Sequence, residues 1–225
     1  MSDYRTLHPA EQKQLEAQGC LASDWSKIFV REQFNPARIR QTTFSGTIYI
    51  GELNRTFDFP GGVVKHAGIT HATIHNTTIG DDVYISQVRN QIANYHIAND
   101  VVIENVDSLT TEGPSCFGNG EMVAVLNEAG GREVPMFNEL SAHTAYLMTF
   151  YRHRPELINK LYQMVETYAN GICSDMGTIS EGVRIINSRT MLNVNFGPGA
   201  LIEGIYRLVN GSVNSSPEHP TYFGP

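Results

Sequence analysis

The chain has 225 residues, enough for one large domain or two small ones, and 41% of them are hydrophobic, which suffices for a buried core. Its 16 basic and 23 acidic residues give a net charge of −7, so nucleic acids and anionic membranes, which attract clustered Lys and Arg, are not expected as partners. No stretch approaches the roughly 18 apolar residues of a membrane span and no apolar export signal opens the chain, so a cytoplasmic location is expected.

A helix is predicted near the N-terminus, over residues 8–19. Pro9 stands at the first helical position and Gly19 stands where a helix commonly ends. We assign residues 1–36 to an N-terminal helical cap segment.

The next part of the chain, residues 37–110, carries four short runs with one internal spacing, and residues 178–225 carry two more. Each run has an apolar residue, a second one four positions later and a third two positions after that. The six runs are Phe44/Ile48/Ile50, Val63/Ala67/Ile69, Ile79/Val83/Ile85, Ile97/Val101/Ile103, Ile179/Val183/Ile185 and Phe196/Ala200/Ile202.

The runs keep a register of eighteen residues. Shifting residues 74–88 forward by eighteen gives seven identities in fifteen positions, where average residue usage predicts roughly one. A solenoid must fill every inward position in every coil, which fixes such a period, whereas an amphipathic helix repeats at 3.6. The sequence therefore predicts a mainly β fold, a left-handed parallel β-helix of hexapeptide repeats.

Polar residues recur between the apolar positions and suit tight corners with left-handed backbone conformations. Hairpin turns in an antiparallel sheet would explain these residues equally well, but not the eighteen-residue register. The corner candidates are Asn76, Gly80, Asn90, Asn94, Asn99 and Asn105.

The repeat is interrupted over residues 111–177 and resumes over residues 178–225. Residues 122–127 and 132–137 flank the turn Ala129-Gly130-Gly131 and predict a hairpin. Two helices follow, the clearer one starting at Pro155 and stopping at Gly171. We expect this insert to leave one corner of the solenoid and to pack against its side.

The segments Ile79-Gly80-Asp81-Asp82-Val83 and Phe196-Gly197-Pro198-Gly199-Ala200 resemble the hexapeptide repeat of bacterial acyl- and acetyltransferases and of sugar-phosphate nucleotidyltransferases. The wider chain resembles a bacterial hexapeptide-repeat family with a domain-of-unknown-function label, whose members continue with further coils. Phe223-Gly224-Pro225 repeats the opening of a coil, so the natural chain is expected to continue past it. The phrases that carry this second resemblance are Gln18-Gly19-Cys20 to Asp24-Trp25, Phe44-Ser45-Gly46, Ile92-Ala93-Asn94-Tyr95, and Ile202-Glu203-Gly204 to Asn214-Ser215-Ser216.

The transferase resemblance implies acyl or acetyl transfer to a sugar or nucleotide sugar, with acyl-coenzyme A in a groove between the subunits of a homotrimer. The alternative is a non-catalytic scaffold or oligomerisation module that self-associates, with any catalytic part outside this chain. The sequence alone leaves both hypotheses open.

A histidine suits the role of general base in such a transfer because its pKa is ordinarily near 6.5. His96 is the catalytic candidate, since it follows Asn94-Tyr95 at a coil edge; an exposed histidine on the face of the column is the competing interpretation. Arg152 and Arg154 are the binding candidates, because guanidinium groups match the geometry of a small anion such as phosphate, although such residues often solvate a helix end.

No metal site is predicted. His66, His71 and His75 fall on neighbouring coil edges, but no Cys or carboxylate cluster accompanies them. The glycine-rich stretch over residues 113–120 lacks the Lys and Ser/Thr of a phosphate-binding loop and is interpreted as a connecting loop.

The three cysteines, Cys20, Cys116 and Cys173, are widely separated and never in C-x-x-C spacing. Three reduced thiols are therefore expected. Cys116 is not assigned as a nucleophile because no partner for it is evident.

Overall fold

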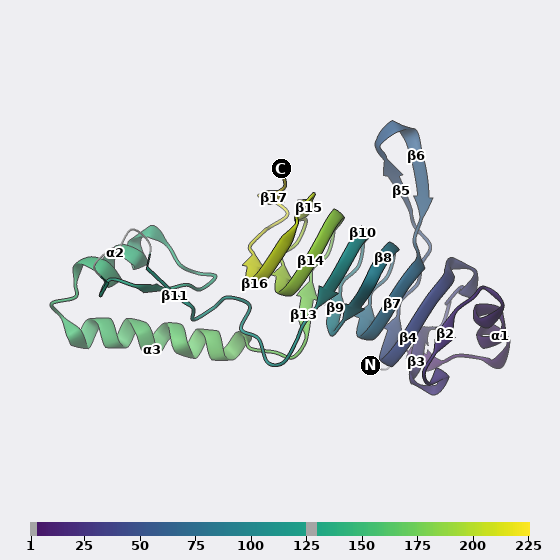
Figure 1. Cartoon of the computed structure of the whole chain (residues 1–225), viewed down its shortest axis with the longest axis horizontal. Helices are drawn as coiled ribbons and strands as arrows, with labels where there is room; N and C mark the ends of the chain where they lie inside the picture. Colours follow the sequence, from purple (N-terminus) through teal and green to yellow (C-terminus); the bar gives the residue numbers. More distant parts are fainter. Residues whose placement is uncertain (1–3, 125–129) are drawn as a thin grey trace.

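The structure is a computed structural model that describes residues 4–124 and 130–225. It is mainly β: strands stack side by side into a column, and two excursions leave that column (Figure 1). The first excursion is a β-hairpin and the second is the insert with its two helices. In the described ranges, no helix has the length and apolar character needed to cross a membrane.

The N-terminal segment covers one end of the column. Helix α1 confirms the helix predicted over residues 8–19: His8 is its N-cap, Glu11 completes the capping box, and Gly19 follows with a φ of 78°. Leu15 on α1 is fully buried against the first layer of strands. The elements here are β1 (Tyr4–Thr6), α1 (Pro9–Ala17), β2 (Leu21–Ala22), η1 (Trp25–Lys27), β3 (Ile28–Arg31) and η2 (Pro36–Arg38).

Long strands that bend around the column make up its body. Their parallel pairing joins each pass of the chain, which we call a layer, to the next. The strands are β4 (Ile39–Ile50), β7 (Gly68–Ile79), β8 (Tyr84–Ala93), β9 (Tyr95–Ile97), β10 (Val102–Thr110), β13 (Gly177–Ile179), β14 (Arg184–Phe196), β15 (Leu201–Glu203), β16 (Arg207–Val213) and β17 (Tyr222–Phe223).

The parallel pairing follows three ladders, each with an inward-facing apolar residue in every layer. The first ladder contains Ile39, Ile69, Ile85, Ile103, Ile185 and Ile202. The second contains Phe44, Ile74, Ile92, Leu109, Met191 and Leu208. The third contains Ile50, Ile79, Ile97, Ile179, Phe196 and Val213.

The eighteen-residue register is confirmed in the middle of the column, where Ile74 pairs with Ile92 and Ile79 with Ile97. Nearly all ladder residues are buried, and burial of each Ile or Val side chain contributes on the order of 1.5–3 kcal/mol. The core is therefore a property of stacked layers, since no single layer can exclude water from its own side chains.

One of the six predicted runs is wrong at its first position. Val63 is 50% exposed and lies on the hairpin of β5 (Thr56–Phe59), η3 (Pro60–Gly62) and β6 (Val63–His66), whereas Ala67 and Ile69 of the same run are buried in the column. The hairpin lengthens this layer, so Ile39 pairs with Ile69.

The corner prediction is confirmed at Asn76, Asn94 and Asn105, which have positive φ angles, and it is wrong at Asn90, Asn99 and Gly80. Gly80 is needed for space instead: a Cβ there would lie 2.5 Å from Oδ1 of Asn99 in the next layer. Asn99 itself accepts a hydrogen bond from the backbone N–H of Asp81 at 2.8 Å.

The insert contains the predicted hairpin and helices, as β11 (Met122–Val123), β12 (Val134–Pro135), α2 (Ala142–Phe150) and α3 (Pro155–Ile172). The expected turn at Ala129 lies outside the described residues. The insert was expected along the side of the column, but it reaches away from the column (Figure 1). The base of the insert contacts the column near β13 and β16. Its own hydrogen bonds and a disulfide, described below, hold it there.

Candidate functional site

Polar side chains follow the outer side of the third ladder, next to the inward apolar residues. His96 pairs in register with Thr178, the backbone N–H of Thr178 donates to Oδ1 of Asn195 at 2.7 Å, and Asn195 pairs with Ser212. Because side chains alternate across a strand, burial of Ile97, Ile179 and Phe196 turns their polar neighbours outward. Four successive layers thus present a row of polar groups.

The base of the insert faces this row and closes a groove of about 460 Å³. Its floor comes from β13, the end of β14 and the end of β16, and its wall comes from the segment before α2 and from α3. The groove is lined by Asn138, Glu139, Tyr168, Thr178, Ser180, Asn195, Phe196, Gly197, Ser212, Val213, Asn214 and Ser215.

Amide side chains fix the insert wall of the groove. Oδ1 of the buried Asn119 accepts from the backbone N–H of Asn138 at 2.8 Å. The carbonyl of Asn138 in turn accepts from Nδ2 of Asn214 at 3.1 Å, which ties the insert to the segment after β16. Tyr168 packs edge-on against Phe137, with ring centroids 5.6 Å apart.

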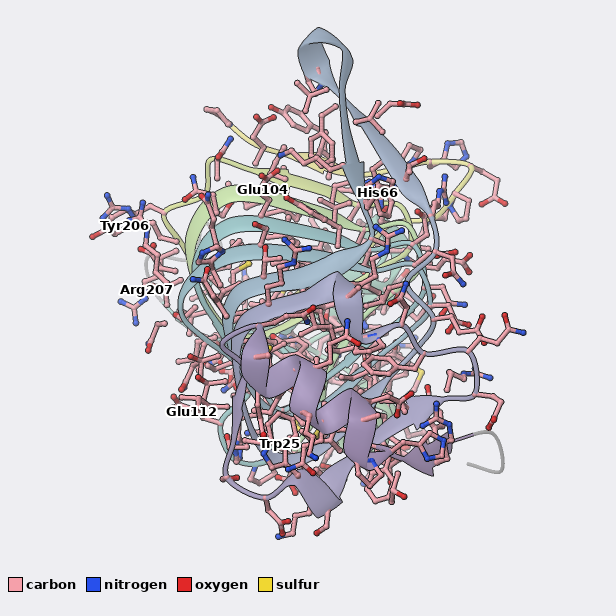
Figure 2. The ribbon with its side chains drawn as sticks, turned by 90° about the vertical axis from the view of Figure 1, so that its right-hand side faces the viewer. Trp25, His66, Glu104, Glu112, Tyr206 and Arg207 are labelled. Carbon is pink, nitrogen blue, oxygen red and sulfur yellow. A yellow bond between two sulfur atoms is a disulfide. The ribbon has the colours of Figure 1, made fainter. Side chains whose placement is uncertain are left out.

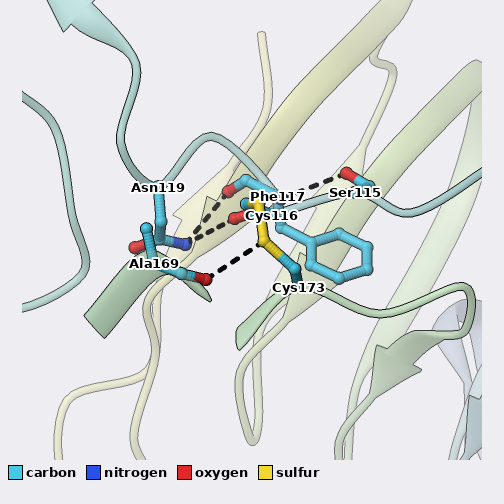
Figure 3. The surroundings of a disulfide bond; sticks show 6 residues. All are labelled: Ser115, Cys116, Phe117, Asn119, Ala169 and Cys173. Carbon is cyan, nitrogen blue, oxygen red and sulfur yellow. Dashed lines mark hydrogen bonds between the residues drawn. A yellow bond between two sulfur atoms is a disulfide. The ribbon is translucent and has the colours of Figure 1, made fainter. Parts of the chain in front are cut away.

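The neck of the insert is closed by a disulfide between Cys116 and Cys173, 57 residues apart (Figure 3). The expectation of three reduced thiols is therefore wrong for these two and holds for Cys20, which is free and buried. Backbone hydrogen bonds of 3.0 Å in both directions between Ser115 and Ser174 close the neck beside the disulfide. Sequence spacing hid this pair because the insert brings together residues that are distant along the chain.

The glycine-rich stretch over residues 113–120 is a loop, as predicted, and it carries one half of this neck. The Phe117 side chain is buried, and its carbonyl accepts from Oγ of Ser212 at 2.9 Å. A Cβ on Gly118 would lie 2.7 Å from the carbonyl oxygen of Asn210, so glycine permits the close approach to β16.

Several polar groups in the groove keep their hydrogen-bonding capacity for a ligand. In the part of the chain that the structure describes, the Tyr168, Thr178 and Ser180 hydroxyls and the Glu139 carboxylate have no hydrogen-bond partner. These groups, with the Asn195 amide, suit a neutral or weakly charged ligand rich in hydroxyl groups.

His96 lies at the edge of this site. It is exposed on β9 between Thr78 and Thr178, one layer away from the groove floor. Adjacent strands are about 4.8 Å apart, so its imidazole is within reach of a ligand that extends beyond Thr178. Its role as general base stays a prediction.

Tyr95, which precedes His96, is a core residue. Its side chain is fully buried and its hydroxyl donates to the carbonyl of Val194 at 2.8 Å. Burial raises the pKa of Tyr95 to about 12, so its phenol stays protonated at neutral pH. Gly177 in the next layer lies directly against this ring.

The two predicted anion-binding residues lie in different surroundings. Nη2 of Arg152 donates to the carbonyl of Glu133 at 2.6 Å, and its guanidinium lies over the ring of Tyr162, which fastens the insert hairpin. Arg154 is the exposed N-cap residue of α3 and lines a shallow cavity with Lys160. An anion shared by Arg152 and Arg154 stays a prediction.

The histidines on neighbouring edges have separate environments. Nδ1 of His75 is 2.8 Å from Oγ of Ser45, whereas His66 stands at the base of the hairpin (Figure 2). Across residues 4–124 and 130–225, no group of three or more His, Cys, Asp or Glu residues is close enough to hold a metal ion.

Sequence reasoning did not identify Tyr168, Glu139 or Asn138 as groove residues. A signal was present, because a hydrophilic segment before α2 and a tyrosine on the inner face of α3 both belong to the insert. Their meeting with the column depends on the neck geometry, which the sequence pattern does not specify.

Comparison with known proteins places this column and its insert within a defined family. Over residues 4–225 the chain matches the family described as "Domain of unknown function (DUF4954)", and it belongs to that family. An uncharacterised protein of Treponema pallidum (strain Nichols) is 30% identical over 232 residues, which cover 98% of this chain and 32% of the relative. The chain thus spans about a third of the relative's length. No solved structure matches significantly.

Proposed function

We propose that the column is a left-handed parallel β-helix of the hexapeptide-repeat type. Each layer contributes one strand segment to each of the three ladders, and successive layers in the middle of the column are eighteen residues apart. Both observations support this assignment, because three six-residue units give one such layer. The resemblance of the Ile79–Val83 and Phe196–Ala200 segments to hexapeptide-repeat transferases supports it as well.

The groove at the base of the insert is proposed to bind the sugar part of a sugar or nucleotide sugar. The observation that carries this proposal is part of its lining: the Tyr168, Thr178 and Ser180 hydroxyls and the Glu139 carboxylate have no hydrogen-bond partner among the described residues and face a groove of about 460 Å³. The hydroxyl groups of a sugar can donate to and accept from these groups, and a molecule without hydroxyl groups would make fewer such hydrogen bonds in the groove.

The proposed reaction is acyl or acetyl transfer from acyl-coenzyme A to a hydroxyl or amine of this acceptor. The acceptor oxygen or nitrogen forms a bond to the thioester carbonyl carbon, and the carbon–sulfur bond breaks. His96 takes the acceptor's proton and returns one to the coenzyme A thiolate. A homotrimer would supply the second wall of the coenzyme A groove.

The experiment uses isothermal titration with UDP-N-acetylglucosamine and coenzyme A, followed by a transfer assay with acetyl-coenzyme A. Tyr168→Ala and Thr178→Val are expected to weaken sugar binding at least about tenfold, since each removes contacts to the ligand. His96→Gln is expected to keep sugar binding and to lower transfer at least about a hundredfold.

The matched control is His71→Gln. His71 is also exposed and lies at a corner with a φ of 52°. Gln41 and Gln87 have similar positive φ angles, so glutamine is accommodated in this backbone conformation. Equal transfer rates for the His96 and His71 variants would contradict the role of His96. An absence of heat with both ligands at millimolar concentration would refute the proposed function as a whole.

The second candidate is a non-catalytic scaffold. It is favoured by the surroundings of His96, which has no carboxylate partner among the described residues, and by the exposed aromatic residues of α2. Tyr146 and Phe150 stack on each other with centroids 4.5 Å apart while 52% and 68% exposed. A scaffold predicts neither sugar binding nor transfer in the same two assays.

A further inference from the structure

A second cavity, of about 360 Å³, lies between the β5–β6 hairpin and the first ladder, on a different ladder from the groove. The hairpin rises from one corner of the column, on the side where Glu104 lies (Figure 2). The cavity is lined by Arg55, Thr56, Phe57, Asp58, Phe59, Val102, Arg184, Ile186 and Leu201.

The hairpin is fastened over the column by aromatic and charged contacts. Phe57 is 5% exposed and its ring lies near two guanidinium groups, with centroid distances of 5.4 Å to Arg55 and 5.2 Å to Arg184. Lys65 lies 4.0 Å from the ring centroid of Phe59 and pairs with Glu104. The cavity is thus preformed, which lowers the entropic cost of binding.

Two guanidinium groups, Arg55 and Arg184, and two carboxylates, Asp58 and Asp100, lie at the cavity, so its formal charges balance. A single carboxylate oxygen, Oδ1 of Asp100, serves both Arg55 at 2.7 Å and Arg184 at 3.3 Å. Asp58 is exposed, alternates with Phe57 and Phe59 along β5 and lines the cavity as well. Asp82 accepts two backbone N–H groups at the hairpin base and does not line the cavity.

Donor capacity remains on Arg55. Only its Nη1 has a hydrogen-bonding or ionic partner among the described residues, and its side chain is 51% exposed, so its other N–H groups face solvent at the cavity mouth. Val102, Ile186 and Leu201 give the column side of the same cavity an apolar surface. A guanidinium fork beside an apolar surface matches a carboxylate attached to a hydrocarbon body.

From this geometry we propose that the cavity under the hairpin binds a small aliphatic carboxylate. The carboxylate accepts hydrogen bonds from Arg55 and is attracted by Arg184, while the hydrocarbon chain packs on Val102, Ile186 and Leu201. The Asp100 carboxylate holds both guanidinium groups in place. This site is independent of the sugar groove, because the two share no residue.

The test is titration of the full chain with hexanoate, hexanamide and inorganic phosphate at low ionic strength. Hexanoate is expected to bind at least about tenfold more tightly than hexanamide, which has the same shape without the charge. Hexanoate is also expected to bind more tightly than phosphate, since phosphate cannot use the apolar surface.

The matched variants are Arg55→Gln and Arg89→Gln. Arg89 is likewise exposed on the column and paired with an aspartate, Asp107, but lies outside the cavity. The first variant is expected to weaken hexanoate binding at least about tenfold and the second less than about twofold. Equal losses in both variants, equal binding of hexanoate and hexanamide, phosphate binding as tight as hexanoate, or no binding of hexanoate would each overturn the proposal.

Discussion

The contact between Tyr95 and Gly177 shows how single residues set the spacing of adjacent layers. Tyr95 is the largest fully buried side chain among the described residues, and its ring occupies the space that a side chain at position 177 would need. A Cβ on Gly177 would lie 2.4 Å from Cε1 of Tyr95 and 2.6 Å from Oγ1 of Thr111. The resumed repeat after the insert therefore depends on a glycine at its first strand position.

Substitution of Gly177 by Ala is expected to destabilise the chain by about 1–3 kcal/mol, because the ring and the backbone must shift to admit the methyl group. Gly171→Ala is the control, since it lies on α3 with no atom within 4 Å of its Cβ position. Alanine there is expected to be neutral or to stabilise by up to about 1 kcal/mol. Urea denaturation measures both, and similar free energies of unfolding for the two variants would refute this account.

Corner residues show how far local preference can be read at this scale. Asn76 and Asn94 were predicted at corners, and both have positive φ angles and are joined through a 3.0 Å hydrogen bond between their amides. Asp82 and Asp100 also have positive φ but were not selected, because the corner prediction used only asparagine and glycine, although aspartate adopts this conformation too. Asn99, by contrast, has no positive φ and bonds the backbone of Asp81 in the neighbouring layer. Only the contacts with the neighbouring layer distinguish such an asparagine from one at a corner.

At the scale of elements, the insert is held by its neck. The Cys116–Cys173 disulfide, the paired backbone bonds of Ser115 and Ser174, and the amide of Asn119 all lie within this short region. Asn119 also accepts the backbone N–H of Asn138 in the groove wall, so the position of the wall depends on the neck. Helix α3 was predictable from Pro155 at its start and Gly171 near its end, but this anchoring was not.

Reduction of the disulfide is expected to loosen the insert and leave the column folded. Closing a loop with this 57-residue separation lowers the entropy of the unfolded insert, which raises its free energy by about 4 kcal/mol. Limited proteolysis with and without dithiothreitol should show faster cleavage within residues 117–172 and an intact column. The Cys116→Ser/Cys173→Ser variant should be cleaved rapidly in both conditions.

Thiol labelling provides the independent check on this pair. Unfolded, unreduced protein is expected to react with iodoacetamide at Cys20 alone, since the other two sulfurs are bonded to each other. Labelling of all three cysteines in protein purified without reductant would contradict the disulfide.

At the scale of the whole molecule, stability is distributed along the column. Middle layers such as β8 and β10 are bonded to strands on both sides, whereas β16 pairs with β14 alone and β17 with β15 alone. Helix α1 covers the first layers, while Val209, Tyr222 and Phe223 near the other end are 40–56% exposed. In a stacked fold, each layer is stabilised by its neighbours.

Hydrogen exchange is expected to reveal this gradient in the 225-residue chain. Amides of β8 and β10 should be protected most, and those of β16 should exchange at least about tenfold faster because they open without breaking bonds on a second side. Mass spectrometry of peptides from β8, β14 and β16 provides the measurement. Equal protection in all three peptides would show that the column unfolds only as one unit.

The sequence by itself determined the stacking register, the first helix and the helices of the insert. These features depend on local periodicity: aliphatic residues every eighteen positions must meet in successive layers, and apolar residues at helical spacing must share one face. Even so, Val63 was assigned to the column because its spacing matched, and only its place on the hairpin shows that it is exposed.

Tertiary structure alone decided where the two excursions meet the column and what their side chains enclose. The residues that meet at these junctions are far apart in sequence, and no periodic pattern relates the two members of a pair. The pairs are Cys116 and Cys173, Tyr168 and Asn195, and Arg55 and Arg184. Their proximity follows from the corners at which the hairpin and the insert leave the layers. Both candidate sites lie at these junctions, because side chains from distant segments converge there around a space that the column alone would leave open.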